Sequence, residues 1–319
     1  MALDGVPLAI GGDAEHSPSS VRQLVYLATG GRQGVAAPGD LKVTQLDVPG
    51  AGVKVASGNG AVLNRVAAQE AYSVRNGVAD TSSVKFTPTG SASGRSDLVI
   101  CRVDNPYIDG NAQAPADPRN GPYVKFDIIP DVPAGTRSLQ ELNQYKGLSA
   151  IELARVDLPK STGTVTNAMI TDLRSLANPR SEPQTLFGSA EPGARLTSST
   201  FTAWPTTNTY EVDVPPWATH IIARLEFMGG QSAAKAAGSL RLILGSSTAF
   251  GQYDYNYAAQ NGQARQMVVV AGELKLPAAV KGTKQPLRIS GLRSDGDGYL
   301  FTVDSTYYLA DVQFVERLA

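Results

Sequence analysis

Three tyrosines alternate with other residues in one short segment of the chain. Tyr253, Tyr255 and Tyr257 occupy every second position, so an extended backbone would place all three rings on one face. Trp204 and Trp217 belong to the same half of the sequence. Flat aromatic rings beside polar groups can hold a sugar, and the same face is suited to packing on a neighbouring subunit. Both contacts are open, and we favour the subunit contact.

Other residue types that do chemistry are sparse. The two histidines, His16 and His220, are too few for a three-histidine zinc site and make histidine-dependent catalysis hard to build. The one cysteine, Cys101, lies in an apolar run, which favours a buried small hydrophobe and excludes a disulfide within the chain. Asp295 and Asp297 are the nearest carboxylate pair for glycoside hydrolysis, but Asp-Gly pairs are typical of turns. We therefore expect no catalytic residues, no metal site and no cofactor.

Length and charge narrow the function classes further. The 319 residues are enough for two domains. The 28 basic and 29 acidic side chains leave a net charge of -1, so no large field favours nucleic acid. No apolar segment approaches the roughly 18 residues that span a bilayer, and no secretory signal is visible. We expect a soluble protein that is made in a cytoplasm, without a nucleic-acid partner or membrane insertion.

The fold class follows from how turn residues punctuate the chain. The 32 glycines and 20 prolines separate short runs rich in Val, Ile, Thr, Tyr and Phe, which predicts a mainly β protein. Turns are expected at 57–60 and 76–77. The strands expected in the first half are 52–56, 61–66, 71–75, 83–87, 97–103, 123–129, 149–158 and 168–173, and those in the second half are 210–214, 220–228, 240–244, 266–270, 287–290, 299–303 and 307–317.

Two helices are signalled among these strands. Ser17 can cap a helix that has Pro18 at its first position and ends at Gly30. One face of this helix is apolar, and we expect it to pack on a partner surface; it comprises Val21, Leu24, Val25 and Ala28. Ser138 and Glu141 have the spacing of a capping box, which predicts a second, shorter helix with Leu139 and Leu142 on one side and Gly147 as its stop.

The chain is expected to form two β domains. Residues 1–176 would form an N-terminal β domain with a short leading helix. The segment 177–196 holds three prolines and two glycines and shows little periodicity, which is typical of a linker. Residues 197–319, with seven or more short strands, suit a β-sandwich, jelly-roll-like in character.

One strand and its companions resemble a known family. The segment 94–104, GRSDLVICRVD, resembles the signature Gly-Arg-x-Asp-Leu-Val-hydrophobic-x-Arg-Val of minor tail proteins from phages that infect actinobacteria. Its companion motifs appear in the expected order at 60–62, 71–76, 123–130, 151–156 and 170–174. The resemblance covers residues 1–176. In physical terms Leu98, Val99, Ile100 and Val103 would form a core strand, while Arg95, Asp97 and Arg102 can pair with charges at its ends or across an interface.

The resemblance implies a structural, non-enzymatic component of a phage tail tip or baseplate that works in the virion. Such an N-terminal domain docks to the tail, and the C-terminal domain varies. Our first hypothesis is a homotrimer whose N-terminal domain and leading helix bind other phage tail proteins. The alternative is a receptor-binding protein whose C-terminal sandwich recognises host cell-surface glycan through the tyrosines and tryptophans. A third hypothesis, a polysaccharide depolymerase, needs a carboxylate pair set in a cleft, and the sequence offers no clear one.

Overall fold

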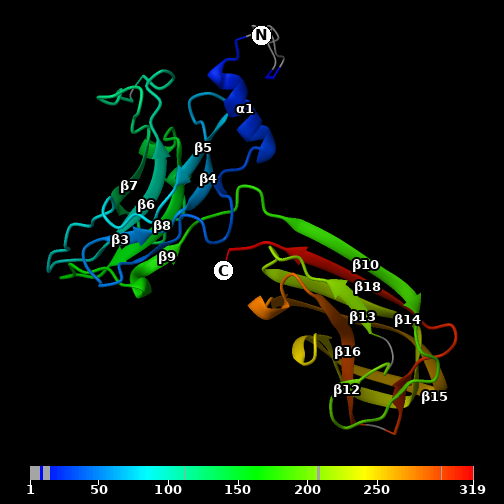
Figure 1. The fold of residues 1–319 in the computed structure, drawn as a ribbon. Helices are drawn as coiled ribbons and strands as arrows, with labels where there is room; N and C mark the ends of the chain where they lie inside the picture. The colour runs from blue at the N-terminus through cyan, green and yellow to red at the C-terminus, as the bar shows by residue number, and fades with distance from the viewer. Residues whose placement is uncertain (1–7, 10–14, 111, 207–208, 296, 319) are drawn as a thin grey trace. The chain divides into compact units, whose positions relative to one another are not determined.

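The computed structural model describes residues 8–9, 15–110, 112–206, 209–295 and 297–318. It divides into an N-terminal unit, residues 1–179, and a C-terminal unit, residues 180–317 (Figure 1). Each unit is built mainly from antiparallel strands, and one α-helix is present in the described part of the chain. The predicted mainly β class is confirmed.

Helix α1 (Pro18–Ala28) begins and ends as the sequence predicts. The Ser17 hydroxyl accepts a hydrogen bond from the backbone N–H of Ser20 at 3.2 Å, and Pro18 occupies the first helical position. Beyond the helix, Gly30 has a φ of 57°, a left-handed conformation that glycine adopts without steric cost. The leading helix is therefore confirmed at both ends.

The strands of the N-terminal unit form three sheets within the described residues. The first contains β1 (Gly34–Val35), β4 (Gly58–Leu63) and β5 (Ala71–Asn76); the second contains β2 (Val43–Gln45) and β3 (Val53–Val55); the third has the order β7 (Val124–Val132), β6 (Arg95–Val103), β8 (Ala150–Leu158), β9 (Ile170–Asp172). Three short 3-10 helices, η1 (Leu139–Glu141), η2 (Asn143–Tyr145) and η3 (Asn167–Met169), lie between strands of the third sheet.

Strand β6 is the core strand that its apolar run predicts. Leu98 and Ile100 are fully buried in one cluster with residues of β7 and η1, whereas Val99 and Cys101 are buried in a second cluster on the opposite face. Because both faces are covered, the run is continuously apolar instead of alternating with polar residues.

Three local predictions in this unit are wrong or only partly right. Residues 57–60 do not form a separate turn, because β4 already begins at Gly58. The segment 83–87 is no strand; it makes a single antiparallel bridge between Gly52 and Lys85, and at its start the Asp80 carboxylate accepts from the backbone N–H of Ser83. The capping box at 138–141 is present, but it caps a 3-10 helix instead of an α-helix.

The C-terminal unit is organised by two long bent strands. Its strands are β10 (Ser181–Ser189), β11 (Arg195–Leu196), β12 (Thr202–Ala203), β13 (Tyr210–Asp213), β14 (His220–Leu244), β15 (Thr248–Lys275), β16 (Lys284–Asp295), β17 (Tyr299–Phe301) and β18 (Tyr307–Val315), and η4 (Ala278–Val280) lies between β15 and β16. The first part of β14 pairs with β18 and with the end of β15, and its last part pairs with β16 and with the start of β15. The hairpin thus contributes to both layers of a sandwich, as the predicted fold class requires.

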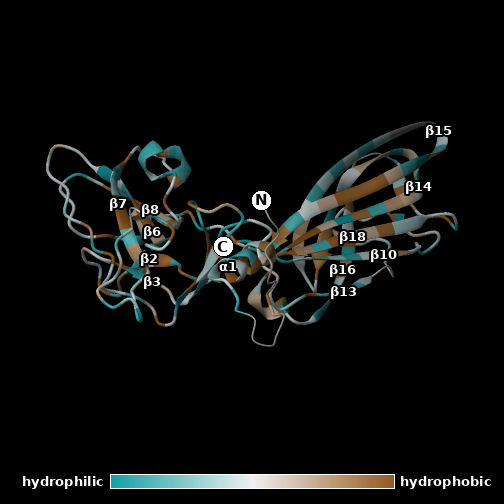
Figure 2. Ribbon diagram, turned by 90° about the horizontal axis from the view of Figure 1, so that it is seen from above, coloured by the Kyte–Doolittle hydropathy of each residue, from teal (hydrophilic) through white to brown (hydrophobic). Residues whose placement is uncertain are grey.

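The bend explains why the sequence suggested more and shorter strands. The predicted strands 220–228 and 240–244 are two ends of β14, and the ladder between them shifts register near Gly229 and again near Ala234. Both residues have positive φ, at 77° and 49°, so they mark bulges where the strand turns from one layer to the other. Figure 2 shows hydrophobic bands along β14, whose inward side chains belong to the core.

The predicted linker is wrong over most of its length. β10 and β11 lie within 177–196, and the division between the units falls between Pro179 and Arg180. β10 pairs along its whole length with β18 near the end of the chain, and the two run side by side in Figure 1. Because this partner is remote in sequence, the local pattern with Pro183 and Gly188 concealed a strand.

Candidate functional site

Tyr253, Tyr255 and Tyr257, the tyrosine row, contact one another along β15 as their spacing predicts. The rings of Tyr255 and Tyr257 stack with their centroids 5.8 Å apart, and burial together with the nearby Tyr253 hydroxyl raises the pKa of Tyr257. Tyr255 is 2% exposed and donates its hydroxyl to the backbone oxygen of Leu292 at 3.2 Å; burial raises its pKa to about 12. Tyr253 is 41% exposed. The row therefore runs from the surface into the core.

The two tryptophans are also divided between core and surface. Trp204 is 2% exposed, packs on Phe227 at a centroid distance of 5.4 Å and donates its ring N–H to the backbone oxygen of Ala194. Trp217 is half-buried, and the guanidinium of Arg180 lies 5.1 Å from its ring centroid. Burial excludes Trp204, like Tyr255, from direct contact with a ligand in this structure. A contact role for Tyr253, Tyr257 and Trp217 stays a prediction.

An apolar cluster that the sequence analysis missed lies on the outer face of the C-terminal sheet. Cross-strand register places Phe187, Leu309 and Val269 in one row, with Tyr307 and Met228 adjacent in the row beyond. The rings of Phe187 and Tyr307 stack at 5.8 Å and are 65% and 43% exposed. The solvent face of such a sheet is normally polar. We name this surface the sheet-face patch; it comprises Phe187, Met228, Met267, Val269, Tyr307 and Leu309.

Helix α1 is oriented with its apolar side away from its own unit. Val21 is 50% exposed, Leu24 is 52% exposed and Leu27 is 74% exposed. A surface helix normally turns its apolar stripe toward the core. Of the stripe predicted to meet a partner, the described part of the N-terminal unit leaves Val21, Leu24 and Ala28 exposed, whereas Val25 is half-buried; the exposed Leu27 was not part of the prediction.

Polar contacts hold the opposite side of α1 on the unit. The Glu70 carboxylate, 5% exposed, accepts hydrogen bonds from Ser19 and Arg22 of the helix, and from the Asn64 side chain at 2.9 Å. The Arg22 guanidinium also lies over the ring of Tyr72. Burial alone would raise the pKa of Glu70, but these hydrogen bonds outweigh it and leave the pKa below its usual value. The inner face of α1 is thus fixed by a buried charge, and its orientation is specific.

The charged residues of the signature strand pair within the chain. Arg95 donates to both carboxylate oxygens of Asp97, at 3.0 and 2.9 Å, and Asp97 also accepts from the backbone N–H of Asp131. Arg102 bridges Asp104 at 2.6 Å and Asp127 at 3.1 Å. Asp97 is 1% exposed, so removing Arg95 would leave a buried charge without its counter-ion. Pairing at the strand ends, as predicted, is confirmed, and it fixes the sheet.

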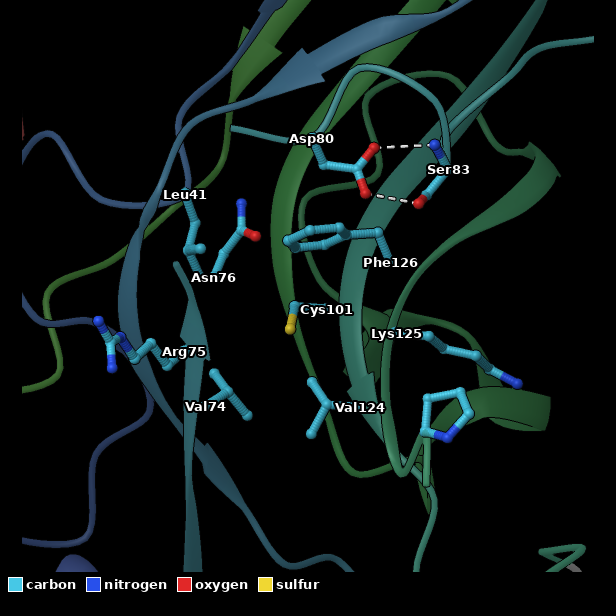
Figure 3. Close-up of a pocket in the computed structure, with 11 residues that line it drawn as sticks. Leu41, Val74, Arg75, Asn76, Asp80, Ser83, Cys101, Val124, Lys125 and Phe126 are labelled. Carbon is cyan, nitrogen blue, oxygen red and sulfur yellow. Dashed lines mark hydrogen bonds between the residues drawn. The ribbon is translucent and has the colours of Figure 1, made fainter. Parts of the chain in front are cut away.

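A pocket of about 330 Å³ opens between β5, β6 and β7. In Figure 3 the side chains of Cys101, Val124 and Phe126 point into it, whereas those of Arg75 and Lys125 extend away. The interior is therefore mostly apolar.

The pocket offers no activated group for catalysis. Cys101 is buried, as predicted, and burial raises its pKa to about 12, so the thiol stays protonated and is a poor nucleophile. The Asp80 carboxylate accepts from the backbone N–H groups of Ser82 and Ser83, at 2.8 Å each, and from the Ser83 hydroxyl at 2.5 Å. Burial alone would raise the pKa of Asp80, but these bonds hold it below its usual value. Asp80 is a turn residue.

The remaining chemistry-bearing residues also lie apart. His220 begins β14, where its ring contacts the Thr219 hydroxyl at 2.9 Å, and burial lowers its pKa. Asp297 lies in the connection between β16 and β17, while the side chain of Asp295 is outside the described residues. Within the described part of the chain, no group of His, Cys, Asp and Glu side chains is placed to hold a metal ion. No helix in that part is long and apolar enough to cross a membrane.

Comparison with known proteins gives distant structural likenesses. No protein-family model and no curated protein sequence matches the chain. The VP2 subviral particle of infectious bursal disease virus is 14% identical, with 94% of this chain and 82% of that chain covered, at a TM-score of 0.24. The structure of the Gx strain of the same virus is 13% identical over 90% and 76% of the two chains, at a TM-score of 0.25.

A glycoside hydrolase shows a likeness of the same low degree. The β-porphyranase of family 86 from the human gut bacterium Bacteroides plebeius is 12% identical, and the match covers 70% of this chain and 30% of that chain at a TM-score of 0.23. With TM-scores this low, none of these likenesses supports an inference about function.

Proposed function

We propose that the chain is a structural, non-enzymatic protein of a virus particle, specifically of a phage tail tip or baseplate. In this proposal it forms a homotrimer and joins other tail proteins through its N-terminal unit. The observation that carries the proposal is the orientation of α1, whose apolar residues Val21, Leu24 and Leu27 point away from the unit. A soluble chain gains nothing from exposing such a stripe unless a neighbouring subunit covers it.

The motifs that resemble minor tail proteins support the same proposal. The segments 94–104, 123–130, 151–156 and 170–174 are distant in sequence, but they fall on β6, β7, β8 and β9, which are consecutive strands of one sheet. The motifs at 60–62 and 71–76 fall on β4 and β5 of a second sheet of the same unit. Motifs that lie on the main strands of two sheets are typical of a scaffold. We propose that the sheet of β1, β4 and β5, whose Tyr72 and adjoining Glu70 contact α1, is the frame on which the helix is presented to the neighbouring tail proteins.

Particle assembly tests the role of α1. Leu24→Glu places a charge in the outward stripe without touching the Glu70 anchor, and Val78→Glu is its matched control at a residue that is 79% exposed elsewhere in the unit. When tagged variants are supplied to assembling phage, we expect Val78→Glu to enter particles like the parent chain and Leu24→Glu to be lost from them. In electron micrographs, a label bound to the tag should be found at the tail tip. Equal incorporation, or label elsewhere, would overturn the proposal.

The alternative function, recognition of a host cell-surface glycan, rests on the accessible aromatic residues of the C-terminal unit. Substituting all three tyrosines would not test it, because Tyr255 belongs to the core. Tyr253→Ala and Trp217→Ala are the informative variants. If the variants lose binding to host cell-wall glycan while the oligomer is unchanged, the receptor role is favoured. If they bind the glycan as the parent chain does, Tyr253 and Trp217 take no part in glycan recognition.

A further inference from the structure

The sheet-face patch occupies one end of an outer face whose other end mixes polar and apolar side chains. At that other end, where the chain enters and leaves the C-terminal unit, Ser181, His220 and Gln313 share their rows with Val315 and Ile222. Toward the opposite end, apart from Ser189 and Glu226, the outward side chains are aromatic or aliphatic on the four neighbouring strands. Met267 is 56% exposed beside the half-buried Met228 and Val269. A patch confined to one end of the face indicates a defined contact area.

A buried carboxylate lies within this outward surface. Glu226 is 8% exposed although its position on β14 points outward, because the side chains of the patch surround it. Its partner is the guanidinium of Arg224 at 2.5 Å, and that side chain is 57% exposed. The surface is thus already partly dehydrated, which lowers the cost of covering it with a partner.

The edge of the sheet is a less suitable contact than its face. β10 is the end strand of the strand order, and strands of this kind can pair with a second chain. Pro183 in the middle of β10 has no backbone N–H, so it interrupts any ladder that would form on that edge. Phe187 and Tyr307, in contrast, project perpendicular to the strands and are free to enter a facing surface.

We propose that the sheet-face patch is the contact between copies of this chain. The charges at its border support a second copy as the occupant: Arg224 and Asp311 are opposite each other in register, both exposed, so one surface carries both signs in adjacent positions. Two such surfaces can place Arg224 of one copy against Asp311 of the next around an apolar centre. The inference deepens the proposed homo-oligomer and rests on it for its biological meaning, but its test needs the purified chain alone.

Charge exchange in the full-length chain provides the test. Arg224→Asp and Asp311→Arg should each weaken self-association by about tenfold, as measured by light scattering over a concentration series. In a ring of three copies drawn from both variants, two contacts join opposite charges and one joins copies of the same variant, so mixing should restore association in part. If Arg224 and Asp311 only compensate each other within one chain, the mixture should stay as dissociated as each variant alone. Phe187→Glu with Met267→Glu should weaken association about a hundredfold, and Val78→Glu should not change it.

The outcomes separate this inference from the proposed function. Unchanged association of the Phe187→Glu, Met267→Glu variant, with circular dichroism like that of the parent, would overturn the patch as the self-contact. A parent chain that stays monomeric at every concentration would do the same. In either case, failure of Leu24→Glu to enter particles would still support the tail role. If Leu24→Glu enters particles normally while the patch variants dissociate, only the tail role is overturned.

Discussion

The tyrosine row and the sheet-face patch arise from side chains at alternate positions, yet the row descends into the core and the patch faces solvent. The difference lies in the strands that face them. Tyr255 lies across from Gly238, where a Cβ would come within 2.6 Å of the tyrosine hydroxyl, so a glycine makes room for an inward ring. Phe187 and Tyr307 lie on the outer face of the sheet, which no strand among the described residues of the C-terminal unit covers. Alternating positions along a strand show which side chains share a face. Whether that face is buried depends on which other strands lie against it.

The largest expected effect on stability is at Tyr255, the most buried residue of the row, and it is compared with a substitution at the exposed Phe187. Tyr255→Ala removes a buried ring together with its hydrogen bond and should lower the free energy of unfolding by about 3–5 kcal/mol. Phe187→Ala, on the exposed patch, should change it by about 0.5 kcal/mol or less in the dissociated chain. Urea unfolding at low protein concentration measures both. Similar losses for the two variants would mean that the faces are assigned wrongly.

A smaller effect is expected at the glycine that admits Tyr255. In Gly238→Ala the new Cβ would lie 2.0 Å from the backbone oxygen of Leu292, so the strands or the ring must shift. We expect a loss of about 1–3 kcal/mol in the same unfolding experiment. Gly90→Ala is the control, because a Cβ there meets nothing within 4 Å. Equal stability of the two variants would contradict the inward course of the row.

Loss of the Glu70 anchor should release α1 while the rest of the unit stays folded. Because the pKa of Glu70 is lowered in the folded chain, its contribution is present above the unfolded value of 4.5 and is lost as pH falls through the folded value. Amide exchange of α1 should therefore lose protection below that pH. Glu70→Gln should weaken the attachment of α1 by about 1–3 kcal/mol and remove the pH dependence. Full protection of α1 in acid would contradict this account.

The smallest effect is expected at Cys101. Its buried thiol, with a pKa raised to about 12, should not react with a thiol reagent between neutral pH and pH 9 in the native chain. The same reagent should label it fully after unfolding in denaturant. Rapid labelling of the native chain would show that the pocket beside Cys101 opens in solution.

The sequence predicted what depends on local chemistry. The cap at Ser17, the stop at Gly30 and the apolar run of β6 each act within a few residues, so pattern and propensity were enough. The alternation of Tyr253, Tyr255 and Tyr257 likewise indicated that the three rings lie together.

What depends on remote partners escaped prediction. β10 was assigned to a linker because its pairing with β18 cannot be seen locally, and the exposed Phe187 of the sheet-face patch was missed for the same reason. β14 was predicted as two strands for the same reason. Its two parts pair with different remote strands on either side of the bend at Gly229, and this pairing cannot be seen locally. The apolar stripe of α1 was found in the sequence, but its outward direction depends on Glu70, which lies far along the chain.

The most direct test of a self-assembling structural subunit is the mass of the purified full-length chain, measured by light scattering across a wide concentration range. The account predicts a species of three times the 33.5 kDa chain mass that dissociates when the sheet-face patch is charged. A mass of 33.5 kDa at every concentration would contradict it.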